Sequence, residues 1–214
     1  MITVECLLSE SRSAANDQGN RPTCLAFAIA TLNRKFAPQD LGPEYFYRSA
    51  ISLIPGWCPG QGLNVAAAKT ASALGHPIEL DYPYQPAEPT TPLEALPTGL
   101  TLYGRAVEFY KPNISRLMSS LQAGEAVGLA LRLTREFFTP TGDIIGFSNI
   151  VLPGTMIHAV VVVGMGYDEH QEPWFLIRNS WGAGWGANGY AWLSSTYVTA
   201  HASCAFGVEH GSSV

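Results

Sequence analysis

The chain has 214 residues, of which 47% are hydrophobic and only 14% are charged, and its formal net charge at pH 7 is -5. This size and composition predict one large domain or two small lobes with a sizeable core. The acidic balance leaves no basic stripe, which argues against nucleic acid as a partner. No apolar run approaches the ~20 residues of a membrane span, so we expect no membrane partner either.

The N-terminal residues 1–5 show neither the basic region nor the apolar region of a signal peptide. We therefore expect a cytoplasmic protein, with export by a specialised secretion route left open. In the cytoplasm the four cysteines, Cys6, Cys24, Cys58 and Cys204, would stay reduced. They form no CxxC pair and the five histidines do not cluster with them, so we predict no metal site and no cofactor.

The first predicted helix begins at Cys24, after a polar turn over residues 17–22. Pro22 suits the approach to a helix, and Thr23 is the predicted N-cap. Apolar residues recur at helical spacing as far as residue 36, and further apolar residues fill the other faces. This pattern indicates a helix that is buried nearly all round.

A second helix is predicted to begin at Pro43, and a third to cover residues 65–74 behind an Asn64 cap. An irregular loop over residues 54–62 separates the two helices. A Pro-rich stretch over residues 82–99 then follows as extended or irregular chain. The first half of the chain is therefore helical and rich in loops.

The second half contains β-branched and aromatic runs of strand length. Residues 157–164 form the strongest run, and residues 174–179 are its predicted hairpin partner. A short helix is expected over residues 114–122. Further strands are expected at residues 101–110, 126–131, 190–193 and 205–208. Helices first and strands later predict an α+β fold.

Cys24 is a candidate nucleophile, because the positive end of a helix dipole stabilises a thiolate. Gln18 lies six residues upstream and offers an amide that could bind a developing oxyanion. The alternative is that Cys24 is a small core residue of an apolar helix.

A thiolate needs a general base, and His158 at the start of a predicted strand is the best candidate. Asn179 closes the next strand, where a hairpin could bring it to His158 and orient the ring. The alternative for His158 alone is a buried, hydrogen-bonded core histidine.

Together these segments resemble the papain-like cysteine peptidase family over nearly the whole chain. The resemblance rests on Gln18-Gly19, on Cys24, on His158-Ala159-Val160 and on the segment Asn179-Ser180-Trp181-Gly182. The order Cys, His, Asn and the distance from Cys to His are those of this family. The Asn-Ser-Trp-Gly segment is the most specific of these signals.

The resemblance implies a single papain-like domain over residues 1–214, with two lobes. Residues 10–105 would form a helical lobe, and residues 1–9 and 106–214 an antiparallel, β-barrel-like lobe, with the active site in a cleft between them. It also implies a cysteine endopeptidase that acts through an acyl-thioester, on a peptide or protein substrate.

Roles for the site residues follow from the same resemblance. Cys24 would be the nucleophile, paired as a thiolate with a His158 imidazolium. Asn179 would orient His158, and Trp181 would cover the hydrogen bond between them. Gln18 would form the oxyanion hole with the backbone amide of Cys24.

Substrate-binding residues are also implied. Gly60, Gln61 and Gly62 resemble the strand that pairs with an extended peptide, with an ordinary Gly-rich turn as an equal alternative. The walls of the main specificity pocket would be Leu63, Met156 and Ala159. Such walls favour an apolar side chain at the second substrate residue before the scissile bond.

The chain departs from the family pattern before Cys24. The family usually carries a cysteine three residues before the nucleophile, where this chain has Arg21. Cys58 resembles the disulfide partner of that cysteine and would be left single. The loop before Cys24 is therefore expected to be held by packing and hydrogen bonds alone. These departures, and a start about where the family's mature enzymes start, indicate a bacterial-type member without a propeptide.

Two other functions remain open. The same chemistry could serve an amidase, deamidase or transamidase that acts on one defined substrate, because the walls of a site set its function. A catalytically silent binding module ranks last, because all four candidate catalytic residues are present. A protein inhibitor or regulator as a partner, and the oligomeric state, are left open.

Overall fold

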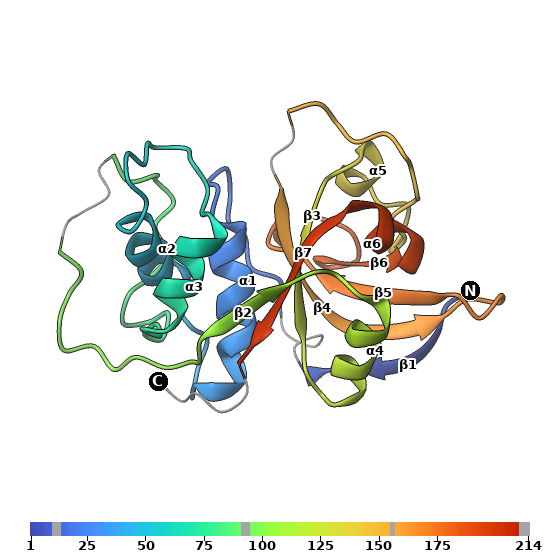
Figure 1. The fold of residues 1–214 in the computed structure, drawn as a ribbon, viewed down its shortest axis with the longest axis horizontal. Coiled ribbons are helices and arrows are strands. Elements are labelled where there is room, and N and C mark those ends of the chain that lie inside the picture. Colours follow the sequence, from blue (N-terminus) through green and yellow to red (C-terminus); the bar gives the residue numbers. More distant parts are fainter. Residues whose placement is uncertain (10–13, 91–94, 155–156, 210–214) are drawn as a thin grey trace. The chain divides into compact units, whose positions relative to one another are not determined.

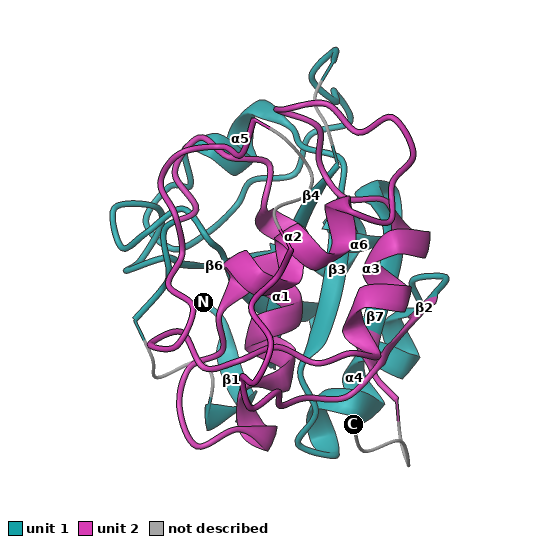
Figure 2. Ribbon diagram, turned by 90° about the vertical axis from the view of Figure 1, so that its left-hand side faces the viewer, with its two compact units in different colours: residues 1–17, 110–206 teal, residues 18–109, 207–214 magenta. Residues whose placement is uncertain are grey.

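A computed structural model describes residues 1–9, 14–90, 95–154 and 157–209 of the chain. The chain divides into two compact units, which Figure 2 colours separately. Unit 1 comprises residues 1–17 and 110–206, and unit 2 comprises residues 18–109 and 207–214.

Where the structure describes unit 2, it contains the α-helices α1 (Cys24–Asn33), α2 (Pro43–Ile51) and α3 (Val65–Ser72), together with a short 3-10 helix, η2 (Arg34–Phe36) (Figure 1). The predicted start of each α-helix is confirmed. Pro43 occupies the first turn of α2, where its missing amide costs nothing. Asn64 caps α3, because its side-chain oxygen accepts the Ala67 N–H at 2.8 Å. Two ends differ. The helix predicted to reach residue 36 ends as α1 at Asn33 and continues as η2, and α3 stops at Ser72 rather than at residue 74.

Helix α1 is buried from Ala26 to Asn33, which confirms the prediction of a helix buried nearly all round. Its two buried polar side chains are satisfied. The Thr31 hydroxyl donates to the Phe27 carbonyl at 2.9 Å, and Asn33 Oδ1 accepts the Arg105 N–H at 2.7 Å. Apolar packing therefore holds helix α1, and the buried polar side chains of Thr31 and Asn33 are both hydrogen-bonded.

The strand predicted over residues 101–110 is confirmed only at its end, as β2 (Val107–Tyr110). The earlier part is wrong because Gly104 adopts a φ of +113°, which breaks an extended run. A Cβ at Gly104 would also lie 3.1 Å from the Asn33 side chain. Before this turn Tyr103 exchanges two backbone hydrogen bonds with His76, each of 2.9 Å.

Unit 1 is built on an antiparallel sheet whose strands are β1 (Thr3–Leu7), β3 (Val127–Leu131), β4 (His158–Tyr167), β5 (Pro173–Arg178), β6 (Tyr190–Ser194) and β7 (Ala202–Val208). The order along the sheet is β2-β7-β3-β4-β5-β6, and β1 pairs with β4. Within the described residues this path does not close on itself, so the sheet is open. The predicted α+β class is confirmed.

The described residues of unit 1 contain three helices, namely α4 (Ile114–Gln122), α5 (Arg135–Phe138) and α6 (Ser195–His201). The bounds of α4 are those predicted, whereas α5, α6 and β1 were not predicted. The core of the unit is formed by buried side chains that include Leu117, Leu121, Leu129, Val160, Val162, Phe175, Ile177, Leu193 and Tyr197. Packing is close enough that a Cβ at Gly128 would lie 2.1 Å from the Phe206 ring. None of the helices in the described ranges combines the length and the apolar character needed to cross a membrane.

Candidate active site

The hairpin of β4 and β5 brings His158 and Asn179 together. His158 is the first residue of β4, and Asn179 directly follows β5. The two strands are antiparallel, with Val161 opposite Arg178. His158 Nε2 lies 2.7 Å from Asn179 Oδ1, and both side chains are buried.

The neighbouring backbone determines how the Asn179 amide and the His158 ring are oriented. The Ser180 N–H donates to Asn179 Oδ1 at 2.8 Å. Because a backbone N–H can only donate, the atom that it contacts must be the amide oxygen. That oxygen can only accept, so His158 Nε2 carries a hydrogen and Nδ1 is the nitrogen whose protonation changes.

Aromatic side chains enclose this hydrogen bond. The Trp181 ring lies 4.6 Å from the His158 ring between centroids, and Phe137 contacts both rings edge-on. Phe138 stacks on Trp181 with a centroid distance of 5.2 Å. Such an enclosure excludes water, which strengthens the hydrogen bond beneath it.

Phe137 and Phe138 belong to α5 and were missed by the sequence analysis. The only local signal is the Phe-Phe pair itself, in a helix of four residues. The Asn179 Nδ2 atom has no hydrogen-bond partner in the described part of the chain, although it is buried.

Burial lowers the pKa of His158 to about 4, and the hydrogen bond to Asn179 opposes this to a smaller extent. The charged form loses its hydration and gains only one neutral acceptor in return. An imidazolium here therefore needs an anion close by, and without one the ring is neutral at pH 7.

Cys24 is the first residue of α1, as predicted, and its first turn carries no acidic residue. Thr23 occupies the N-cap position of this helix, as predicted, but its side chain does not cap the helix. Thr23 has a ψ of 9° rather than an extended value, and it makes no side-chain cap hydrogen bond. Its hydroxyl lies 2.8 Å from the Tyr84 hydroxyl instead.

Gln18 is buried in the same loop, and its orientation is fixed by two contacts. Its Nε2 donates to the Arg21 carbonyl at 2.7 Å. The Tyr84 hydroxyl donates to the Gln18 carbonyl at 2.8 Å, so in the Thr23 contact Tyr84 must be the acceptor. The single Tyr84 hydroxyl thus connects Gln18 to the residue before Cys24.

Residues 60–62, called the candidate substrate strand after the resemblance, lie in the same unit as Gln18 and Cys24. They form no regular strand here, because the Gln61 N–H donates to the Cys58 carbonyl at 3.0 Å and closes a turn. Gly60 has a φ of +84°, which favours glycine, and Gln61 is exposed. The Gln61 carbonyl accepts the Trp57 indole N–H at 3.0 Å. A Cβ at Gly62 would lie 3.6 Å from the Pro22 carbonyl, so this strand runs beside the loop that precedes Cys24.

Of the three residues predicted to form the walls of the specificity pocket, the structure describes Leu63 and Ala159. Leu63 is half-buried and directly precedes the Asn64 cap of α3. Ala159 is buried in β4, opposite Ala130 of β3. Met156 lies outside the described residues. The neighbouring Ile157 is 53% exposed.

The cysteines form no disulfide in the described residues. Cys58 is exposed, whereas Cys6 and Cys204 are half-buried and donate to the carbonyls of Leu121 and Tyr110. Burial raises the pKa of the Cys204 thiol. Cys58 is therefore the most accessible of the four thiols, since Cys24 is also half-buried.

From the sequence, the loop before Cys24 was expected to be held by packing and hydrogen bonds alone. This expectation is wrong, because ion pairs hold the loop as well. Arg21 is only 4% exposed and forms ion pairs with Glu44 and Glu88. These pairs could not be predicted from local patterns, because both carboxylates lie far from Arg21 along the chain.

Residues 13–210 match the family model described as papain family cysteine protease. The chain belongs to the papain family of cysteine proteases. The resemblance predicted from the sequence is thereby confirmed. Among curated proteins, ananain from Ananas comosus is 25% identical over 207 residues, covering 92% of this chain and 56% of ananain. A viral cathepsin from Spodoptera litura multicapsid nucleopolyhedrovirus is 27% identical over 184 residues, covering 81% of this chain and 51% of the cathepsin.

This chain thus spans about half the length of the curated relatives that it matches. Two solved structures share the fold. Digestive procathepsin L 3 of Tenebrio molitor has a TM-score of 0.77 at 18% identity, covering 96% of this chain and 70% of that one. Xylellain from Xylella fastidiosa has a TM-score of 0.72 at 20% identity, covering 97% and 87%.

Proposed function

We propose that this protein is a cysteine endopeptidase that hydrolyses peptide bonds through a Cys-His-Asn mechanism. Cys24 is the nucleophile, His158 the general base and acid, Asn179 the residue that orients His158, and Gln18 an oxyanion donor. Membership of the papain family supports the class of activity.

In this mechanism the Cys24 thiol gives its proton to His158 Nδ1. The thiolate attacks the scissile carbonyl carbon, and the oxygen becomes an oxyanion that the Gln18 amide and the Cys24 N–H stabilise. The Nδ1 proton then passes to the leaving amine, which leaves an acyl-thioester on Cys24. Water, deprotonated by His158, hydrolyses the thioester and restores the thiol.

The observation that carries the proposal is the contact between His158 and Asn179. The hydrogen bond of 2.7 Å and the Ser180 N–H together fix Nε2 as the protonated nitrogen. Proton exchange is therefore confined to Nδ1, as a general base requires. A core histidine would need no such orientation and no aromatic cover.

The low pKa of His158 is compatible with this chemistry. Burial disfavours a lone imidazolium, whose pKa would be about 4. A thiolate provides the missing anion, and the first turn of α1 stabilises that thiolate by up to ~2 kcal/mol. The two charges thus stabilise each other, and neither is stable alone.

We further propose that the substrate is a peptide or protein with an apolar side chain at the second position before the scissile bond. Leu63 and Ala159 are the described residues that support this preference, and neither carries charge.

A peptide library tests the proposal when it is incubated with wild type, Cys24→Ala and the matched control Cys58→Ala. We expect chain cleavage after an apolar second residue by wild type and by the control. Cys24→Ala should lose about 10⁶-fold in kcat, because removal of a nucleophile eliminates the covalent pathway.

Other products would contradict the proposal. Conversion of side-chain amides without chain cleavage would make the protein a deamidase. Binding without any product would make it a binding module. Turnover by Cys24→Ala would refute the assignment of the nucleophile.

A further inference from the structure

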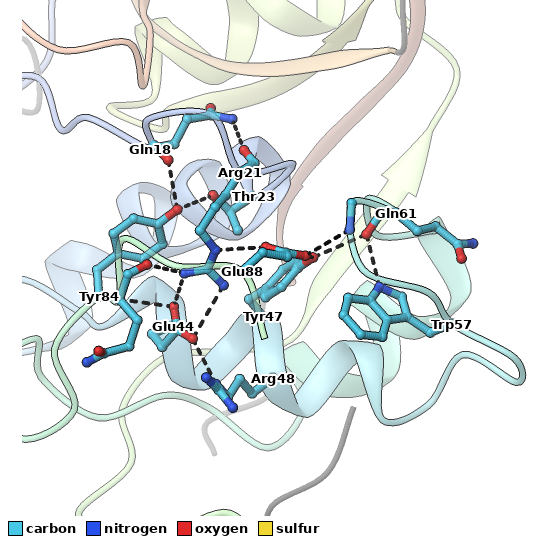
Figure 3. Close-up of polar contacts among 12 residues, drawn as sticks. Gln18, Arg21, Thr23, Glu44, Tyr47, Arg48, Trp57, Gln61, Tyr84 and Glu88 are labelled. Atoms are coloured by element: carbon cyan, nitrogen blue, oxygen red, sulfur yellow. Dashed lines mark hydrogen bonds and ion pairs between the residues drawn. The ribbon is translucent and has the colours of Figure 1, made fainter. Parts of the chain in front are cut away.

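A buried arginine anchors the loop that carries Gln18 and ends at Cys24. The Arg21 guanidinium pairs with Glu44 through Nη1 and Oε2 at 2.5 Å, and with Glu88 through Nε and Oε2 at 2.8 Å (Figure 3). It also donates to the Gln85 carbonyl. Arg21 Nη2 donates to Glu44 Oε1 at 3.4 Å as well, so four of its five donor hydrogens point to acceptors from two distant segments. A guanidinium fork has enough donors for this set, whereas an ammonium has only three.

Two tyrosine rings complete the site of the guanidinium. Arg21 Cζ lies 5.1 Å from the Tyr47 ring centroid and 4.7 Å from that of Tyr84. These cation–π contacts restrict the plane of the guanidinium. Arg21 is therefore held by charge, hydrogen bonds and ring faces at once.

The charges around Arg21 balance. Glu44 is fully buried, and its second oxygen accepts from Arg48 Nε at 2.8 Å. Two arginines thus face two carboxylates, Glu44 and Glu88. A buried ion pair contributes favourably only when its remaining lone pairs are satisfied, and here neighbouring donors meet that condition.

The backbone of Arg21 transmits this anchoring to the oxyanion donor. The Arg21 carbonyl accepts from Gln18 Nε2 at 2.7 Å and from the Thr23 N–H at 2.8 Å. The position of the guanidinium therefore determines the position of the carbonyl that orients the Gln18 amide.

Glu88 extends the same network to the candidate substrate strand. Its Oε1 accepts from the Tyr47 hydroxyl at 2.6 Å and from the Gly60 N–H at 3.4 Å. The Tyr47 hydroxyl also lies 3.1 Å from the Gln61 carbonyl. Burial and the Glu88 carboxylate raise the pKa of Tyr47, so its hydroxyl remains a donor.

We propose that Arg21 is a positioning residue that, through Glu88, fixes the oxyanion-donor loop of residues 18–24 against the substrate strand of residues 60–62. This inference rests on the proposed peptidase function and adds a residue that touches neither substrate nor nucleophile. The binding energy of a peptide on the strand is then coupled to the placement of its carbonyl at Gln18.

Glu88→Gln tests the coupling with little change in size. The amide has one acceptor oxygen where the carboxylate has two, so it cannot hold Arg21, Tyr47 and Gly60 together. We expect kcat for a peptide substrate to fall about 10- to 100-fold, because a displacement of about 1 Å at a reacting centre costs this much. KM should rise because the substrate strand loses its anchor.

Arg34→Gln is the matched control. It removes an exposed ion pair with Asp40, which lies outside the Arg21 network. We expect this variant to keep kcat and KM within about 2-fold of wild type, because an exposed pair contributes little. Arg21→Lys is the second test variant, since it keeps the charge and should fold, yet it cannot bridge both carboxylates as a fork.

Two further measurements separate positioning from general loss of structure. Alkylation of Cys24 by iodoacetamide needs no oxyanion hole, so its rate should be unchanged in Glu88→Gln. Amide hydrogen exchange should rise about 10-fold in residues 18–24 and 60–62 together, but not in α3, because only the two coupled segments loosen.

Failure of the coupling through Arg21 and Glu88 can be distinguished from failure of the proposed peptidase function. Wild-type kcat and wild-type exchange in Glu88→Gln would overturn the coupling. A uniform rise in exchange across unit 2 would also overturn it, since Arg21 would then be only structural. If wild type hydrolyses no peptide, the proposed function fails, and joint loosening of the two segments still decides whether Arg21 and Glu88 couple them.

Discussion

His76 should make the folded protein sensitive to acid. Its side chain is 1% exposed, and neither ring nitrogen has a hydrogen-bond partner among the described residues. Burial lowers the pKa of His76 to about 4, against a smaller opposing effect of the Gly42 backbone. An unfolded chain would bind the same proton with a pKa of about 6.5.

The sign and the size of the effect follow from this difference. Between about pH 6.5 and 4 the unfolded state binds more protons than the folded state, so stability falls as the pH falls. The difference of about 2.5 pKa units corresponds to a loss of about 2.5 kcal/mol by pH ~4.5 and almost none at pH ~7.5.

The assay is urea unfolding of His76→Leu and its parent across this pH range, both with Cys24→Ala to prevent self-digestion. We expect His76→Leu to gain about 2.5 kcal/mol over its parent between pH ~7.5 and ~4.5. His158 titrates in both proteins and cancels in the comparison. His170→Gln is the control for the loss of an exposed histidine, because the His170 side chain is 78% exposed.

A constant difference between His76→Leu and its parent at every pH would refute the reasoning. It would mean that His76 takes up its proton in the folded state as readily as in the unfolded one. A rise in stability on acidification of the parent would refute it as well.

Three further variants test the site and the sheet. Gln18→Ala should lower kcat about 10²-fold with little change in KM, because the oxyanion forms only after attack; an equal rise in KM instead would contradict this role. Asn179→Ala should lower kcat about 10²-fold and narrow the pH–rate profile on its alkaline side, since the His158 imidazolium loses the acceptor that raises its pKa, and an unchanged profile would count against it. Gly128→Ala should lower the unfolding free energy by about 1–3 kcal/mol in thermal melts, because its Cβ would overlap Phe206, and an unchanged Tm would contradict the packing.

The features predicted best from the sequence are those that depend on residues close together along the chain. Helix α4 has the predicted bounds, since Asn113 caps it through the Arg116 N–H and Leu117 and Leu121 share its buried face. The closeness of His158 and Asn179 could also be anticipated, because a single hairpin joins the two residues. Helix α6 was missed although Ser194 caps it, because its seven residues are too short for a periodic pattern.

Prediction from the sequence failed for residues whose contacts lie far away along the chain. Thr23 is a residue type that favours the N-cap position, yet its hydroxyl contacts Tyr84 in another segment rather than the helix backbone. In the sequence, Arg21 was noted only because it stands where the family usually has a cysteine. Its carboxylate partners are Glu44 of α2 and Glu88, both far away along the chain. No local rule connects such residues, so ion pairs and aromatic contacts around the site became visible only in the folded chain.

The pH dependence of Cys24 alkylation tests most directly the central claim, that this cysteine is a thiolate nucleophile paired with His158. Iodoacetamide is applied across about pH 5–9, with peptide mapping of Cys24 and of the exposed Cys58 as an internal reference. A free cysteine reacts as its thiolate forms near pH 8.5, whereas paired cysteines react far below that pH. We predict that at pH ~6 Cys24 reacts at least about 10-fold faster than Cys58 in wild type, and that His158→Ala abolishes this difference. Equal rates for Cys24 and Cys58 at that pH in wild type would contradict the account.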